Sequence, residues 1–406
     1  MTSPPRTIGL RARRGLAATL AVALITLAGC SSSSLADDQR TDGTIRIGLI
    51  WPKTGPYQAL GVDMERGWQL YLDSHGGTLG GHTVTTATGD EGVNQNTALT
   101  AAKKLLDADR ATVLVGTASA DPTVAIAPIA NQRKVPFIGT GGRPGSLTPA
   151  DLGYVWHTSW QSRETGAAIA DHIRTTVNGP VYLMAPDYQG GWDQLGGFTD
   201  AFTKAGGKVA NPDGKPAWTP WGSTSVNFLP YLNKIKDSGA KAVYCFYAGT
   251  MAVDFVKQYK QSGLTIPLYG AGFLTEGAFL LKSEGAAADG VQTVMNYVPD
   301  LDNPDNRTFS TAYQQKYQTP PSIYSVTAWD AALLLDQAIA AAGANPTSES
   351  INTAIGKLGA IASPRGSFRL GTVGHSPVQA WYLRKVAFDG RTRANVTQQT
   401  LTTLGS

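Results

Sequence analysis

Short apolar runs alternate with helical segments along most of the chain, and the first pair begins at Ile45. The run Ile45–Ile50 is rich in β-branched residues, which is typical of a strand buried on both faces of a parallel sheet. It ends before a turn cluster, Thr54–Tyr57, in which glycine and proline supply the backbone angles, and helical spacing follows over Met64–Ser74. This order places the loop at the carboxyl end of a strand, where open α/β sheets bind ligands.

The same alternation continues twice over and predicts the fold class. Strand-like runs at 83–87, 112–115 and 135–138, and later at 181–185, 242–246 and 268–271, are separated by helical segments. Strands that alternate with helices imply parallel sheets with right-handed crossovers. Tyr154–Trp160 breaks the rhythm, so we interpret it as the crossing into a second lobe. We therefore predict an α/β protein with two doubly wound parallel-sheet lobes, ending in a hairpin over 366–370, 378–386 and the tail.

The first 29 residues are predicted to be a targeting segment. Four arginines precede a short apolar stretch at 16–27, which is too short for a confident membrane span. Leu27–Cys30 resembles a bacterial lipobox, in which the cysteine is lipidated. We expect Cys30 to hold the protein at the outer side of the cell membrane, with 30–43 as a flexible tether. A plain secretory signal with an incidental Cys30 is the alternative.

Charge and length limit the possible partners. The 406 residues suffice for two domains, and the net charge of +4 comes entirely from the four arginines of the targeting segment. The remainder has equal numbers of basic and acidic residues, which gives no reason to propose nucleic acid as a partner. The protein is expected to be a monomer.

No motif indicates catalysis or a metal. Cys245, the only cysteine after Cys30, lies in an apolar run typical of a buried strand, and the histidines lack partners at zinc-ligand spacing. The glycine-rich loop Gly139–Gly145 does not keep the spacing of a phosphate-binding loop, and no nucleophile elbow is present. We expect neither an enzyme nor a bound metal or cofactor.

Aromatic residues stand at or beside strand–loop junctions. Each one alone is explained by packing at least as well as by ligand contact. Together they suit a closed cleft that encloses a small molecule. They are Trp51, Tyr57, Trp160, Tyr188, Trp192, Tyr247, Phe273 and Tyr324.

A set of short motifs that occur in one order indicates a protein family more specifically than any single motif does. The set includes Thr54–Pro56, Gly76–Gly77, Asp90, Val115–Gly116, Ala125–Pro128, Val135–Ile138, Asp187–Tyr188, Ala205–Gly207, Pro321, Tyr324 and Trp329–Ala331. With these motifs the chain resembles, over nearly all of 44–390, the branched-chain amino acid type of periplasmic substrate-binding protein of ABC importers, fold type I.

The resemblance implies two lobes that close on a ligand like a trap, joined by three crossings. We place the crossings near Thr158, near Gly290 and at 366–371. Lobe 1 would then comprise 44–158 and 291–366, and lobe 2 would comprise 159–290 and 367–400. The closed form of such a protein docks on a membrane permease with its ATPase subunits. A sensing subunit of the same fold that feeds a signalling partner is the alternative.

The resemblance also assigns ligand contacts in the first lobe. A carboxylate-binding serine at a helix N-terminus falls on Ala120, one position after Ser119, and the amides and dipole there can hold an anion. Asp121 opposes an anion at this place. Arg143 is either a clamp for a carboxylate or a solvated loop charge. The positions assigned are Leu60 beside Tyr57, then Ser119, Ala120, Gly141, Gly142 and Arg143.

In the second lobe the aromatic contacts fall on Tyr247 and Tyr324. The acid that accepts a ligand ammonium falls near Gly272, where no acid stands, and Glu276 is four residues further on. A buried ammonium needs a partner, so this departure puts an α-amino acid ligand in doubt. The expected ligand is a small polar or carboxylated metabolite, either an amino acid or a related aromatic or amide-like compound.

Overall fold

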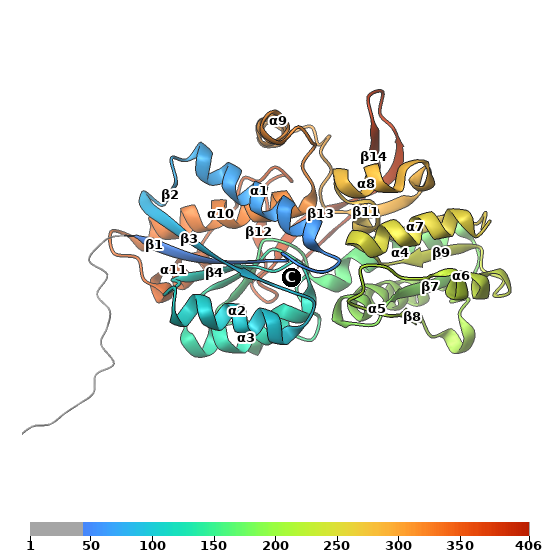
Figure 1. Ribbon diagram of the computed structural model, residues 1–406, viewed down its shortest axis with the longest axis horizontal. Coiled ribbons are helices and arrows are strands. Elements are labelled where there is room, and N and C mark those ends of the chain that lie inside the picture. The colour runs from blue at the N-terminus through green and yellow to red at the C-terminus, as the bar shows by residue number, and fades with distance from the viewer. Residues whose placement is uncertain (1–43, 406) are drawn as a thin grey trace, which may run out of the picture. The chain divides into compact units, whose positions relative to one another are not determined.

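The computed structural model describes residues 44–405 (Figure 1). The predicted targeting segment, Cys30 and the tether lie outside the described residues. Within the described range, none of the helices combines the length and the apolarity that a membrane crossing needs.

The first lobe is built on a six-stranded sheet of order β2-β3-β1-β4-β5-β6. Every neighbouring pair is parallel except β2 with β3. Helix α1 packs against α10 and α2 against α3. The strands are β1 (Ile45–Trp51), β2 (Thr78–Leu79), β3 (His82–Asp90), β4 (Val113–Gly116), β5 (Phe137–Gly139) and β6 (Val155–His157); the helices are α1 (Gln58–Ser74), α2 (Gln95–Asp107), α3 (Ala120–Arg133), α10 (Ile323–Ala342) and α11 (Ser348–Ile355).

The second lobe is built on an eight-stranded sheet of order β12-β13-β11-β10-β9-β7-β8, with β14 paired to β13. The strands from β8 to β11 are parallel, and the predicted terminal hairpin is confirmed as antiparallel β13 and β14. The strands are β7 (Val181–Pro186), β8 (Ala217–Thr219), β9 (Ala242–Cys245), β10 (Leu268–Ala271), β11 (Gln292–Met295), β12 (Arg369–Leu370), β13 (Pro377–Phe388) and β14 (Arg393–Leu404).

The helices of the second half of the chain are divided between the lobes. Helix α4 packs against α5, and α7 against α8, whereas α9 packs against α1 of the first lobe. Their bounds are α4 (Ser162–Val177), α5 (Gln189–Lys204), α6 (Leu229–Lys236), α7 (Gly249–Gln261), α8 (Ala278–Glu284) and α9 (Pro304–Tyr317). The predicted α/β fold with two lobes is thus confirmed, with mixed, mostly parallel sheets.

The second crossing lies later in the chain than the sequence analysis places it. That analysis puts it near Gly290 and assigns 291–297 to the return toward lobe 1. Strand β11 instead pairs in parallel with β10 and antiparallel with β13, so the chain leaves the second sheet after Met295. A short apolar strand suits either sheet, and only its partner strands decide which sheet receives it.

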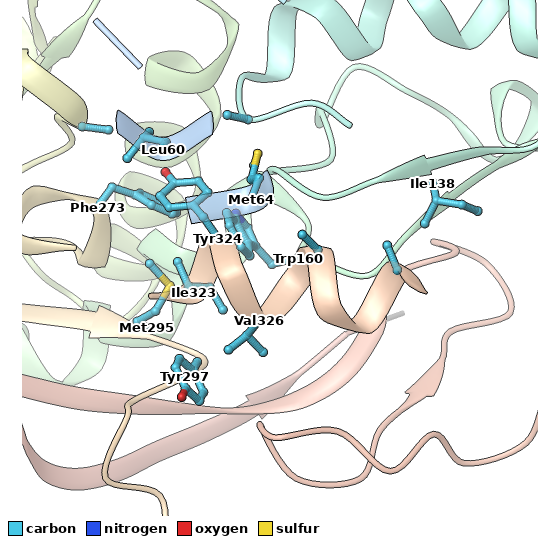
Figure 2. Packing of buried hydrophobic residues seen from close by; sticks show 14 of the residues in the cluster. Leu60, Met64, Ile138, Trp160, Phe273, Met295, Tyr297, Ile323, Tyr324 and Val326 are labelled. Atoms are coloured by element: carbon cyan, nitrogen blue, oxygen red, sulfur yellow. The ribbon is translucent and has the colours of Figure 1, made fainter. Parts of the chain in front are cut away.

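The largest cluster of buried apolar side chains extends from the first lobe into the second. Figure 2 shows Leu60 and Met64 of α1 close to Tyr324 and Phe273, with Trp160 beside them. Trp160 follows the first crossing, and Phe273 follows β10 of the second sheet. Aromatic residues from both lobes therefore meet where the lobes face each other.

A buried ion pair ties the crossings together. Arg365 Nη2 lies 2.8 Å from Asp330 Oδ2 of α10, and both side chains are almost fully buried. The same guanidinium donates to Thr158 O at 2.5 Å on the first crossing and to Gln379 Oε1 at 2.6 Å on β13. Burial raises the pKa of the Asp330 carboxyl, and Arg365 lowers it. One side chain thereby fixes three segments that are distant in sequence.

Replacement of Arg365 by Met should destabilise the protein by about 3–5 kcal/mol, because Asp330 would remain as a buried charge without a counterion. The free energy of unfolding is measured by denaturant titration. Arg307→Met is the matched control: it removes an exposed pair with Asp302 and should cost at most about 1 kcal/mol. Equal losses in the two variants would contradict the structural role of Arg365.

Candidate ligand-binding site

A cavity lies where the carboxyl ends of the strands of both sheets face each other. The space there that no protein atom fills amounts to about 300 Å³, part of which is open to solvent. Both lobes and the first crossing contribute to it. The lining residues are Tyr57, Ala118, Ala120, Gly142, Trp160, Ser162, Tyr188, Gly190, Gln194, Phe246, Phe273 and Tyr324.

Aromatic rings form most of the wall. The rings of Trp160 and Phe273 have centroids 5.1 Å apart, and Phe246 meets Phe273 edge to face at 5.5 Å. Tyr324 stands 6.5 Å from Trp160 in a T-shaped arrangement. Phe246 is the first residue after strand β9 and Phe273 the second after β10. Loops at such strand ends present their side chains to the crevice. Such a wall favours a flat apolar ligand body.

One end of the cavity is the start of helix α3. The helix begins at Ala120 with Ser119 as its N-cap. The Ser119 side chain makes no capping bond, and its buried Oγ has no hydrogen-bond partner among residues 44–405. Ala118 and Ala120, on either side of Ser119, line the cavity. A helix N-terminus with an unpaired hydroxyl favours an anion.

Glu91 lies behind this helix start and is fully buried. Its two carboxylate oxygens accept the backbone N–H groups of Ala118 and Ser119, each at 2.7 Å. Burial raises the pKa of Glu91 to about 8, although the two amide bonds lower it. The sequence analysis missed Glu91. Its one signal is its place after Asp90 at the end of β3, a loop that also faces the crevice.

Two polar atoms of the lining residues themselves lack partners in the described part of the chain. Trp160 Nε1 is an unpaired donor, and Gln194 Oε1 on α5 is an unpaired acceptor. Buried polar atoms normally have hydrogen-bond partners. Together with Ser119 Oγ, these atoms offer a ligand polar contacts on both lobes and on the crossing between them.

The structure places seven of the predicted site residues in the lining. These are Tyr57, Ala120, Gly142, Trp160, Tyr188, Phe273 and Tyr324. The sequence analysis missed Ala118, Ser162, Gly190, Gln194 and Phe246 there. The other eight predicted residues do not line the cavity: Trp51, Leu60, Ser119, Gly141, Arg143, Trp192, Tyr247 and Gly272.

Packing explains most of the residues outside the lining. Trp51 and Leu60 belong to the core, and Tyr247 lies in the core of the second lobe, with its hydroxyl 3.2 Å from Thr219 Oγ1. Phe246, its neighbour, lines the cavity instead, because successive residues of an extended chain point to opposite sides. Trp192 is 48% exposed, and its Nε1 donates to Asp187 at 2.8 Å.

The structure excludes one of the two predicted roles of Arg143, and the clamp for a carboxylate stays a prediction. It is only 6% exposed, so a solvated charge is wrong. Its Nη1 donates to Leu147 O of the same loop at 3.3 Å, and the side chain does not line the cavity. Burial lowers the pKa of Arg143.

Glu276 is engaged on both carboxylate oxygens. Oε2 pairs with Arg384 Nη1 at 2.7 Å and Oε1 accepts Ile323 N at 2.6 Å. Arg384 also donates to Gly272 O at 3.0 Å, at the position where the resemblance places an acid. Glu276 is thus engaged within the protein, and it does not line the cavity where a ligand ammonium would lie.

The lobes touch each other at the rim of the cavity. The hydroxyls of Tyr57 and Tyr188 share a hydrogen bond of 2.7 Å, and Trp221 stacks on Tyr188 with centroids 4.0 Å apart. Gln189 N donates to Asp121 Oδ1 at 3.3 Å, and Gly145 N donates to Asp193 Oδ2 at 2.9 Å. Each of these hydrogen bonds joins the first lobe to the second, so the described conformation is closed.

Two α/β lobes that close on a cavity at their strand ends define a two-lobe solute-binding protein. The chain belongs to the periplasmic binding protein family, which matches residues 44–391. This finding confirms the resemblance at the level of the family, whose members are solute receptors and not enzymes. Among curated proteins, a Leu/Ile/Val-binding protein homolog 6 of Brucella melitensis is 29% identical, over 89% of this chain and 93% of that protein.

Solved structures extend the comparison. A solute-binding protein of an ABC transporter from R. palustris, in complex with benzoate, is 31% identical with a TM-score of 0.83, over 90% of this chain and 98% of that chain. Another from R. palustris, in complex with 4-hydroxybenzoate, is 25% identical with a TM-score of 0.81, over 89% and 97% of the two chains. A leucine-binding protein of Thermotoga maritima shares the fold, with a TM-score of 0.77. It is 21% identical, over 88% of this chain and 99% of that chain.

Replacement of Tyr188 by Phe should open the ligand-free protein, because it removes the hydroxyl bond to Tyr57 between the lobes. A net contribution of about 0.5–1.5 kcal/mol per hydrogen bond predicts a roughly 2- to 12-fold loss in the ratio of closed to open forms. The distance between spin labels on the two lobes reports this ratio. Tyr244→Phe is the matched control, since its buried hydroxyl has no partner in the described residues. An equal ratio of closed to open forms in both variants would show that the hydrogen bond between Tyr57 and Tyr188 does not hold the lobes together.

Proposed function

We propose that the protein is the extracytoplasmic receptor of an ABC importer and that it captures a small aromatic carboxylate, of the benzoate class, by closure of its lobes. The observation that carries the proposal is the cavity itself: aromatic walls from both lobes enclose a helix N-terminus with the unpaired Ser119 hydroxyl. The aromatic walls suit a ring, and the helix start suits a carboxylate.

The charges around the cavity support an acid without an ammonium group. Glu276 is paired with Arg384, and Glu91 is bonded to two backbone amides. Neither carboxylate is available to a buried ammonium, which would then lack a partner. The relatives solved with benzoate and with 4-hydroxybenzoate support the same ligand class, whereas the Leu/Ile/Val-binding homologue keeps an amino acid as the competing candidate.

The candidate ligand contacts are divided between the two lobes, and this division explains why a ligand would close them. Ser119 belongs to the first lobe and Gln194 to the second, so a ligand reaches both only in the closed form. A ligand shifts an equilibrium by its difference in affinity for the two forms. The ligand thereby stabilises the closed protein, and a permease that recognises both lobes together selects the loaded receptor.

Benzoate should bind and stabilise the protein, whereas L-leucine should not. At a hundred times its dissociation constant, a ligand adds about 2.7 kcal/mol to the free energy of unfolding. Thermal unfolding with each compound, followed by calorimetric titration, measures this effect. Stabilisation by leucine together with none by benzoate would overturn the proposal in favour of an amino acid receptor.

Replacement of Ser119 by Ala should weaken benzoate binding about tenfold or more, because a hydrogen bond to a charged group contributes about 1.5–3 kcal/mol. Ser376→Ala is the matched control. Its buried Oγ also lacks a partner in the described residues, but neither of its chain neighbours lines the cavity, whereas Ala118 and Ala120 on either side of Ser119 do. Equal affinities of the Ser119 variant and the parent protein would exclude the helix start as the carboxylate site.

We also propose that Cys30 carries a lipid and anchors the receptor to the membrane. The order of basic region, apolar stretch and Leu27–Cys30 in the sequence supports this anchor. Metabolic labelling with an alkyne fatty acid should mark the parent protein, and Cys30→Ala should remove both the label and the membrane association. A labelled Cys30→Ala variant would contradict the anchor.

A further inference from the structure

We propose that Glu91 couples the binding of an anionic ligand to the uptake of one proton. This inference rests on the proposed function, since it concerns how the same site receives a carboxylate. Glu91 would contact the start of helix α3, and its protonation would set the net charge of the site when a ligand is bound.

The argument begins with the occupied amides. Glu91 accepts the N–H groups of Ala118 and Ser119 at 2.7 Å each, and these residues lead into α3. The next amides, of Ala120 and Asp121, belong to the first turn of the helix and have no intrahelical acceptor. The unpaired Ser119 Oγ lies between the two sets of amides. A ligand carboxylate held by this hydroxyl and the next amides would lie within one helical turn of the Glu91 carboxylate.

Two buried carboxylates at one helix end cannot both remain ionised at low cost. Like charges in one site raise the pKa of one of the pair, so that the pair shares a proton. Once protonated, Glu91 keeps an acceptor oxygen for the backbone and directs its O–H toward the ligand carboxylate. The proton comes from solvent, and the complex carries one negative charge in place of two.

The surroundings of Glu91 supply no cation that would relieve the repulsion. Asp90, on the same loop, raises the pKa of Glu91 further, and burial is the main cause of the value of about 8. The titratable groups that face it from other elements are the hydroxyls of Tyr57 at the start of α1 and of Tyr324 on α10. Lys53, at the end of β1, donates its Nζ to Thr88 Oγ1 at 2.6 Å.

The sign of the pH dependence follows from this arrangement. A bound anion raises the pKa of Glu91 above its value in the free protein, so binding takes up a proton between the two values. Affinity for benzoate should therefore be nearly constant well below pH 8 and fall as the pH rises above it, by up to about tenfold between pH 6 and pH 9. Benzamide, which is neutral over this range, should show no such trend.

Calorimetric titration of the full chain with benzoate and with benzamide, from pH 6 to pH 9, tests the proposal. Titration in two buffers of different ionisation enthalpy should report uptake of up to one proton per benzoate bound. Glu91→Gln should make benzoate affinity independent of pH and abolish proton uptake, whereas Glu91→Asp, which keeps an acid, should retain both. Asp109→Asn, at an exposed pair with Lys104, is the control for a change in net charge alone.

The outcomes separate the two proposals. Benzoate binding with constant affinity and no proton uptake would overturn the role of Glu91 and leave the proposed function standing. Binding of benzamide without benzoate would show that the site excludes anions, which overturns both proton uptake and the carboxylate as the ligand. Failure of both compounds in the presence of a competent amino acid ligand would overturn the proposed function, and the inference with it.

Discussion

The aromatic contact between the two lobes is the interaction on which the remaining structure depends. Tyr57 from the first lobe meets Tyr188 from the second through their hydroxyls, and Trp221 packs against both rings. Because both sheets direct the carboxyl ends of their parallel strands toward this contact, neither lobe forms the cavity by itself. The cavity exists only where the two sets of loops meet, so it forms only when the lobes close.

Burial of charge separates the framework of the protein from its site. Asp330 and Glu276 are each paired with a buried arginine that also bonds backbone carbonyls, and both pairs hold segments distant in sequence. Removal of one partner from such a pair is costly, so these carboxylates are committed to structure. At the cavity, by contrast, buried polar atoms are left without partners. Ser119, Trp160 and Gln194 present polar atoms that no described residue satisfies, which is expected where a ligand completes the hydrogen bonds.

The alternation of strands and helices was enough to predict both lobes, because a parallel strand buried on two faces has a distinctive apolar pattern. It was not enough to place β11, whose sheet is decided by its partners β10 and β13. At the site, position at a strand end found Phe273 and Tyr188 but chose Tyr247 over Phe246, since one residue of register inverts the side that a side chain faces. Glu91 gave no signal except its place after β3, and Gln194 gave none, because their roles arise from contacts between distant segments.

The closing hydrogen bonds and the candidate ligand contacts share the same loops. Asp121, in the first turn of α3, accepts an amide from the second lobe, and Asp193, next to Gln194, accepts one from the first. Closure therefore positions both polar ends of the cavity at once. These rim bonds are made between protein groups alone, so they contribute to the balance between the closed and open forms. A ligand shifts this balance only by the difference between its binding free energies for the closed and the open form. Because its partners are divided between the lobes, that difference is large.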